Sequence, residues 1–144
     1  MNPYTIELKA YKEQAVNTMT AGEMLNLLYE EIIKRLRKAE ILAKHSDFDN
    51  FEKEVKRAQE IVAYLNATLD RKYPISLELA RFYSFFNYQM ARLAAGRNLE
   101  LVNEIIPLVE DLRTAYKQAD KLSREQTSNT GGQANNTGGL AGEK

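Results

Sequence analysis

The chain has 144 residues with 20 basic and 20 acidic side chains, so its formal net charge is zero. The length suits one domain, and the balanced charge argues against a general nucleic-acid binder or a polybasic membrane-surface protein, which both need a basic face. The absence of Cys excludes disulfides and thiolate chemistry, and without a long apolar run or a secretory signal we expect no membrane span and a cytoplasmic location.

Residues 1–19 hold scattered apolar side chains but no sustained helical stripe. We interpret this segment as a short N-terminal arm whose apolar anchors are Tyr4, Ile6 and Leu8, followed by Tyr11. Two interpretations stay open: the arm covers a partner groove while the partner is absent, or it is frayed as chain termini usually are.

Two segments, residues 21–44 and 48–70, repeat apolar side chains at helical spacing and are predicted to be helices. Thr20 and Glu23 have the spacing of a capping box at the start of the first helix. Asp47 lies in a break whose residues favour a helix start. The side chains of these two helices that we assign to the core are Leu25, Leu28, Ile32, Leu36, Val55, Val62 and Leu65.

A third helix is predicted over residues 76–95, with Ser76 as its N-cap and Gly96 as a residue of positive φ at its end. Five of the thirteen aromatic side chains of the chain fall between residues 82 and 88 of this helix. A helix turns about 100° per residue, so these aromatics cover more of its surface than one core-facing stripe uses. This helix therefore either lies between several neighbours or offers part of its surface to a partner.

A fourth helix is predicted over residues 99–122, capped by Asn98 and kinked but not broken at Pro107. Pro107 lies opposite the apolar stripe, so the backbone carbonyl near Asn103, which loses its N–H donor to the proline, would face water at reduced cost. From residue 123 to 144 the chain is rich in Gly, Asn and Thr and poor in apolar side chains, which predicts a disordered tail.

Helices joined by loops of a few residues favour antiparallel neighbours. The fold class predicted is therefore all-α, an antiparallel up-and-down four-helix bundle over residues 20–122, with the short arm before it and the disordered tail after it.

Catalytic and metal-binding patterns are sparse. His45 is the only histidine, and we interpret it as an exposed residue at a helix C-terminus, where the helix dipole favours a cation. The Glu-x-x-His pairs of di-iron bundles and the Gly-rich loops of phosphate sites are absent from the sequence. We therefore predict a protein that is not an enzyme and needs no cofactor or metal. Its function would lie in apolar surface offered to a partner.

An ordered series of residues resembles the FliS family, the flagellar secretion chaperones of flagellin. The residues that carry the resemblance are Tyr11, Val16-Asn17-Thr18, Thr20, Glu23-Met24-Leu25, Leu27-Leu28-Tyr29-Glu30, Ala58-Gln59, Ile61, Leu65, Leu69, Leu79, Phe82-Tyr83, Phe85 and Leu112 to Tyr116. The chain departs from the family pattern at Ala21, Glu31, Lys72-Tyr73-Pro74, Tyr88-Gln89 and Tyr116. The change to Tyr88-Gln89 replaces a basic pair and makes that surface more aromatic.

The resemblance implies a cytosolic export chaperone that binds the disordered C-terminal segment of flagellin, prevents premature polymerisation and delivers flagellin to the flagellar type III export apparatus. The candidates for partner contact are Tyr11, Tyr29, Phe82, Tyr83, Phe85, Phe86 and Tyr88. For each of them the alternative is simple core packing. The alternative function is a non-enzymatic adaptor or scaffold whose helical bundle dimerises or docks another amphipathic helix.

Overall fold

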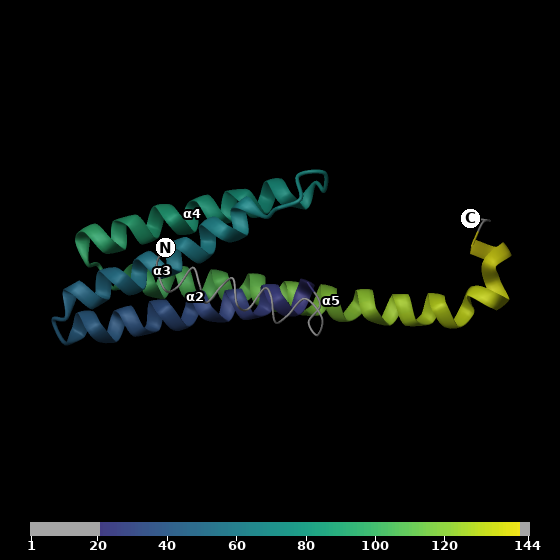
Figure 1. The fold of residues 1–144 in the computed structure, drawn as a ribbon, viewed down its shortest axis with the longest axis horizontal. Coiled ribbons are helices and arrows are strands. Elements are labelled where there is room, and N and C mark those ends of the chain that lie inside the picture. The colour runs from purple at the N-terminus through teal and green to yellow at the C-terminus, as the bar shows by residue number, and fades with distance from the viewer. Residues whose placement is uncertain (1–20, 142–144) are drawn as a thin grey trace.

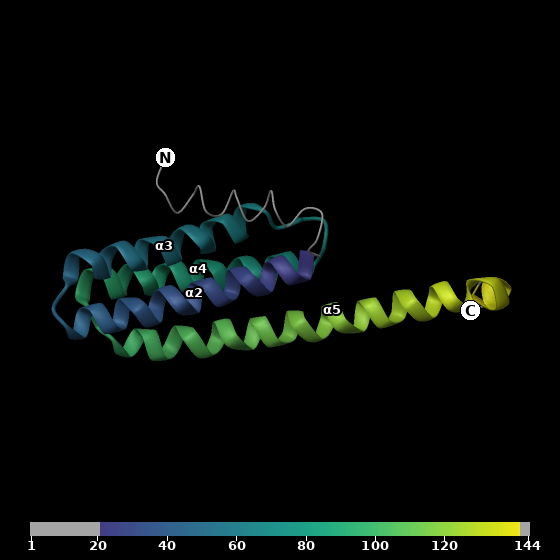
Figure 2. The same cartoon turned by 60° about the horizontal axis from the view of Figure 1, so that its bottom comes forward.

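The structure, a computed structural model, describes residues 21–141. Within them the chain forms the helices α2 (Ala21–Lys44), α3 (Phe48–Ala67), α4 (Ile75–Gly96) and α5 (Glu100–Ala141). Figures 1 and 2 show these helices running up and down beside one another, which confirms the predicted all-α bundle. Thr20, Tyr11 and the anchors of the arm lie outside the described residues.

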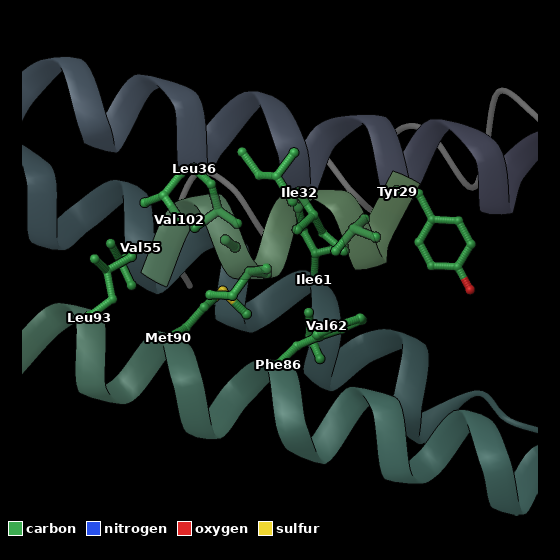
Figure 3. Close-up of a cluster of buried hydrophobic side chains, with 14 of the residues drawn as sticks. Tyr29, Ile32, Leu36, Val55, Ile61, Val62, Phe86, Met90, Leu93 and Val102 are labelled. Atoms are coloured by element: carbon green, nitrogen blue, oxygen red, sulfur yellow. The ribbon is translucent and has the colours of Figure 1, made fainter. Parts of the chain in front are cut away.

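The helices pack around one apolar core. α2 packs against both α3 and α5, α3 also packs against α4, and the contacts between α4 and α5 are fewer. Figure 3 shows side chains of all four of these helices pointing toward one another, among them Ile32, Val62, Met90 and Val102. Each such side chain contributes about 1.5–3 kcal/mol by leaving water.

The core assignments from the sequence agree with the structure. Leu28, Ile32, Leu36, Val55, Val62 and Leu65 are buried, and Leu25 is half-buried against them. Regular spacing was sufficient for this prediction because α2 and α3 each turn one narrow stripe toward the core.

Local capping explains where α3 begins and ends. The carboxylate of Asp47 accepts a hydrogen bond from the backbone N–H of Asn50 at 3.4 Å, as the break in the sequence suggested. The helix ends at Ala67, earlier than the predicted residue 70. There the Thr68 hydroxyl donates to the carbonyl of Tyr64 at 3.0 Å, which satisfies one of the unpaired carbonyls of the last turn.

Two predictions for the ends of α4 are wrong. The N-cap position belongs to Pro74, whose side chain makes no capping hydrogen bond, and Ser76 is buried inside the helix. Proline suits this place because its φ is already helical. At the other end the residue of positive φ is Arg97, with φ 56°, and not Gly96. The guanidinium of Arg97 lies 3.8 Å from the ring centroid of Phe48, a cation–π contact that favours this conformation.

α5 begins as predicted, since the Asn98 side-chain oxygen accepts a hydrogen bond from the backbone N–H of Glu100 at 3.1 Å. It continues through the exposed Pro107. It then runs to Ala141 and projects past the other helices (Figures 1 and 2), whereas the sequence predicts disorder after residue 122. A single helix can extend this way because its backbone hydrogen bonds are internal and need no neighbour. The domain boundary at residue 122 stays a prediction.

Candidate partner-binding surface

The aromatic run of α4 is divided between the core and the surface. Tyr83 and Phe86 are buried, whereas Phe82, Phe85 and Tyr88 expose 36%, 40% and 63% of their surface. The rings of Phe82 and Phe85 each lie 6.2 Å from the ring of Phe86, so the exposed rings rest on a buried one. α4 therefore presents an exposed aromatic surface that packs against the buried ring of Phe86.

A groove runs between α4 and α5 beside these rings. Its volume is about 360 Å³, and its lining consists of Glu78, Arg81, Phe82, Phe85 and Leu108. Farther along, the two helices are joined, because the amide of Gln89 donates to a carboxylate oxygen of Glu104 at 3.2 Å. The helices are thus held together near the α4–α5 turn and leave apolar side chains open along the other half of their contact.

A larger apolar pocket lies at the end of the bundle where α3 and α4 are connected. Its volume is about 480 Å³. The side chains that line it include Leu25 and Leu28 from α2, Leu69 and Tyr73 from the connection, and Ile75 and Leu79 from α4. Tyr73 and Ile75 are more than half exposed, so this pocket opens onto apolar surface.

Two tyrosines meet beside this pocket. The hydroxyl oxygens of Tyr29 and Tyr83 lie 2.6 Å apart and share a buried hydrogen bond. The ring of Tyr29 also lies 6.0 Å from that of Tyr116 on α5. Burial raises the pKa of Tyr29 above its usual range and raises the pKa of Tyr83 to about 12, so both hydroxyls are neutral near pH 7. Their hydrogen bond connects α2 to α4.

A buried ionic cluster joins α2 to α3. The carboxylate of Glu54 lies 3.3 Å from Arg35, 3.5 Å from Lys38 and 3.3 Å from Arg57. Arg35 also pairs with Glu31 at 2.7 Å. This cluster was not foreseen from the sequence, because Glu54 and Arg35 stand among other charged residues whose spacing favours a solvated face.

Metal-ligating side chains do not cluster in the part of the chain that the structure describes. No group of three or more His, Asp or Glu side chains among these residues is placed to hold a metal ion. His45 is exposed, and its Nδ1 lies 2.9 Å from the carbonyl oxygen of Ile41 in the last turn of α2, as predicted for a helix end. None of the described helices is long and apolar enough to cross a membrane.

The sequence-predicted contact residues separate into two groups. Phe82, Phe85 and Tyr88 lie together on the surface of α4, whereas Tyr29, Tyr83 and Phe86 are packed in the core. Tyr11 lies outside the described residues. Sequence spacing missed the exposed Leu77, Tyr73 and Ile75, which the structure places near the start of α4. No helical stripe marks these three side chains in the sequence.

Comparison with known proteins agrees with this architecture. The family of the flagellar protein FliS matches residues 4–123. The flagellar secretion chaperone FliS of Bacillus subtilis (strain 168) is 30% identical over 131 residues, covering 91% of this chain and 96% of that protein. A crystal structure described as a flagellar chaperone from bacteria superposes with a TM-score of 0.69 at 18% identity, over 83% of this chain and 98% of that one. That likeness shows the fold, and the family match with the Bacillus relative shows that the chain belongs to the FliS family of flagellar secretion chaperones, a chaperone family and not a class of enzymes.

Proposed function

We propose that this protein is a cytoplasmic export chaperone for flagellin. It would bind the disordered C-terminal segment of flagellin, keep flagellin from polymerising and deliver it to the flagellar type III export apparatus. The observation that carries the proposal is the exposed, supported aromatic surface of α4 in a chain of the FliS family.

The physical requirements of such a client support this proposal. A disordered segment that folds on binding must offset several kcal/mol of ordering free energy by burying a large apolar surface. The α4–α5 groove and the pocket at the end of the bundle supply two apolar hollows on one preformed scaffold. An amphipathic helix of the client would lay its apolar face over Phe82, Phe85 and Leu108.

Charged residues at the rim of the groove would orient the client. Glu78 and Arg81 stand at the edge of the apolar lining, and their carboxylate and guanidinium lie 3.6 Å apart. Exposed charges of this kind add little affinity but disfavour wrong registers. Apolar contact therefore supplies most of the binding free energy, and the rim supplies the direction.

The proposal is tested by gel filtration of the protein with intact flagellin and, separately, with flagellin lacking its C-terminal segment. We expect a complex that contains both proteins with intact flagellin and none with the truncated form. Equal binding to both forms, or to neither, would contradict the proposal. A stable homodimer without affinity for flagellin would favour an adaptor function.

A further inference from the structure

The apolar pocket at the α3–α4 connection has a methionine in its wall. Met24, at the start of α2, lines this pocket of about 480 Å³ together with Leu28, Leu69 and Leu79. Its side chain is half-buried and packs against the apolar core, so part of it stays open to water. A molecule small enough to enter the pocket can therefore reach the Met24 side chain from solution.

The surroundings of the methionines distinguish Met24 from Met90. The chain has four methionines and no Cys, so no thiol competes with them for an oxidant. Met90 has an exposed fraction of 0% in the core, and Met1 and Met19 lie outside the described residues. Susceptibility to oxidation follows exposure. Among the described residues, Met24 is therefore the methionine that a dissolved oxidant meets first.

We propose that Met24 is a site of reversible oxidation by peroxides and that its sulfoxide weakens the binding of apolar ligands in the pocket. A lone pair of the thioether sulfur attacks one oxygen of hydrogen peroxide, and the O–O bond breaks. The departing hydroxide takes the proton from the transferred oxygen and leaves as water, so the sulfur is oxidised by two electrons and the peroxide is reduced. Methionine sulfoxide reductases reverse the step. With a dithiol as electron donor, the oxygen leaves as water and the dithiol becomes a disulfide.

The lining of the pocket determines what this oxidation changes. Leucine, isoleucine and tyrosine side chains form most of it. Oxidation converts the flexible apolar side chain of Met24 into a polar one whose oxygen accepts hydrogen bonds. An apolar ligand that covers this oxygen donates no hydrogen bond to it, and a buried polar group without a partner costs free energy. The pocket thus binds apolar ligands in the reduced protein and binds them more weakly in the oxidised one.

The oxidation of Met24 goes beyond the proposed binding of flagellin and does not require it, because any apolar ligand of the pocket should respond. Where a client segment occupies the pocket, oxidation would weaken its binding and the reductases would restore it. Met90 is fully buried in the core, so oxidation confined to Met24 should leave the bundle folded.

Peptide mapping tests the site of oxidation. The wild-type protein is treated with hydrogen peroxide, and mass spectrometry follows the gain of one oxygen atom at each methionine. We expect Met24 to be oxidised at least about tenfold faster than Met90, because Met24 is half-buried and Met90 is fully buried. Equal rates at these two residues would overturn the proposal.

The effect on the pocket is measured with the neutral apolar dye Nile red, whose fluorescence reports its binding to the protein. Peroxide treatment should raise the dissociation constant of the dye at least about fivefold in the wild type, because the new oxygen is left without a partner. The reductases with dithiothreitol should restore the original constant. Met24→Leu keeps the side chain apolar and similar in volume, so its affinity should not respond to peroxide. Met24→Gln should bind the dye weakly with and without peroxide, since its amide is already polar.

The remaining methionines are controlled in the same titration. Met90→Leu is the matched control, and its affinity for the dye should respond to peroxide as that of the wild type does. Met24→Leu retains Met1, Met19 and Met90, so a response caused by any of these three would persist in it. Such a persistent response, an unchanged affinity of the oxidised wild type, or no dye binding to the untreated protein would overturn the proposal.

Discussion

The Tyr29–Tyr83 pair shows how two single residues connect α2 to α4. Tyrosine brings a large apolar ring into a core but also a hydroxyl that needs a partner when it is buried. With their oxygens 2.6 Å apart, each hydroxyl supplies that partner for the other. The pair therefore satisfies two polar groups beside the apolar end pocket without admitting water.

Replacing Tyr29 by Phe should destabilise the protein by about 1–2 kcal/mol, because the hydroxyl of Tyr83 then stays buried without its partner. Urea unfolding followed by circular dichroism measures this change. Tyr88→Phe, at the exposed position, is the matched control and should change the free energy of unfolding by no more than about 0.5 kcal/mol. The double variant Tyr29→Phe/Tyr83→Phe should cost less than the sum of its parts, and strict additivity would argue against the shared hydrogen bond.

The same pair predicts a loss of stability at alkaline pH. Burial raises the pKa of Tyr83 from 10.0 to about 12, and it also raises the pKa of Tyr29. Below pH 10 the stabilisation from these neutral hydroxyls is fully present, and above pH 10 the unfolded chain loses protons that the folded chain retains. Between pH 10 and 12, each of the two tyrosines should lower the free energy of unfolding by up to about 1.4 kcal/mol per pH unit. In the double Phe variant the slope should be smaller, and an equal slope would contradict this assignment.

At the scale of elements, the contact between α2 and α3 combines an apolar stripe with the buried Glu54 cluster. Removing one member of a buried ion pair leaves the other charge desolvated, which costs more than the pair contributes. Glu54→Leu should therefore destabilise the protein by about 3 kcal/mol in urea unfolding. Arg35→Leu/Glu54→Leu removes both charges and should be the more stable of the two variants. If the double variant were less stable, the pair would be a net source of stability.

Pro107, inside α5, also affects the stability of a whole helix. Proline has no backbone N–H, so the carbonyl near Asn103 lacks its helical donor on the exposed side of α5. Pro107→Ala supplies the missing N–H and a better helix former, so thermal unfolding should show a stabilisation of about 1 kcal/mol or more. Glu110→Ala, also exposed on α5, controls for a general effect of alanine. A destabilised Pro107→Ala variant would mean that the packing of α5 depends on the proline.

At the scale of the whole molecule, the sequence was sufficient to predict the helical bundle and its core. It was not sufficient to predict every helix end or every contact between helices. Leu28, Ile32 and Val62 could be assigned because helical spacing alone decides which side chains face inward. Turn geometry at Pro74 and Arg97 could not be predicted, since it depends on contacts such as the Arg97–Phe48 stacking that join different helices.

The candidate surface could be predicted only in part for the same reason. An excess of aromatic residues on α4 was evident from the sequence, but which rings are exposed depends on the position of α5. Gln89 joins α4 to α5 through Glu104, and this contact determines where the groove beside Phe82 and Phe85 opens. Neither residue carries a pattern that marks it in the sequence.

We propose that the aromatic surface of α4 binds the C-terminal segment of flagellin. Calorimetric titration of that segment, as an isolated peptide, into the wild-type protein and into Phe82→Ser/Phe85→Ser tests it directly, with Ile41→Ser as control. We expect binding with a negative heat-capacity change to the wild type and the control, because apolar surface is buried, and affinity at least about tenfold weaker for the double variant. Absence of binding to the wild-type protein, or equal affinity for all three proteins, would contradict the claim.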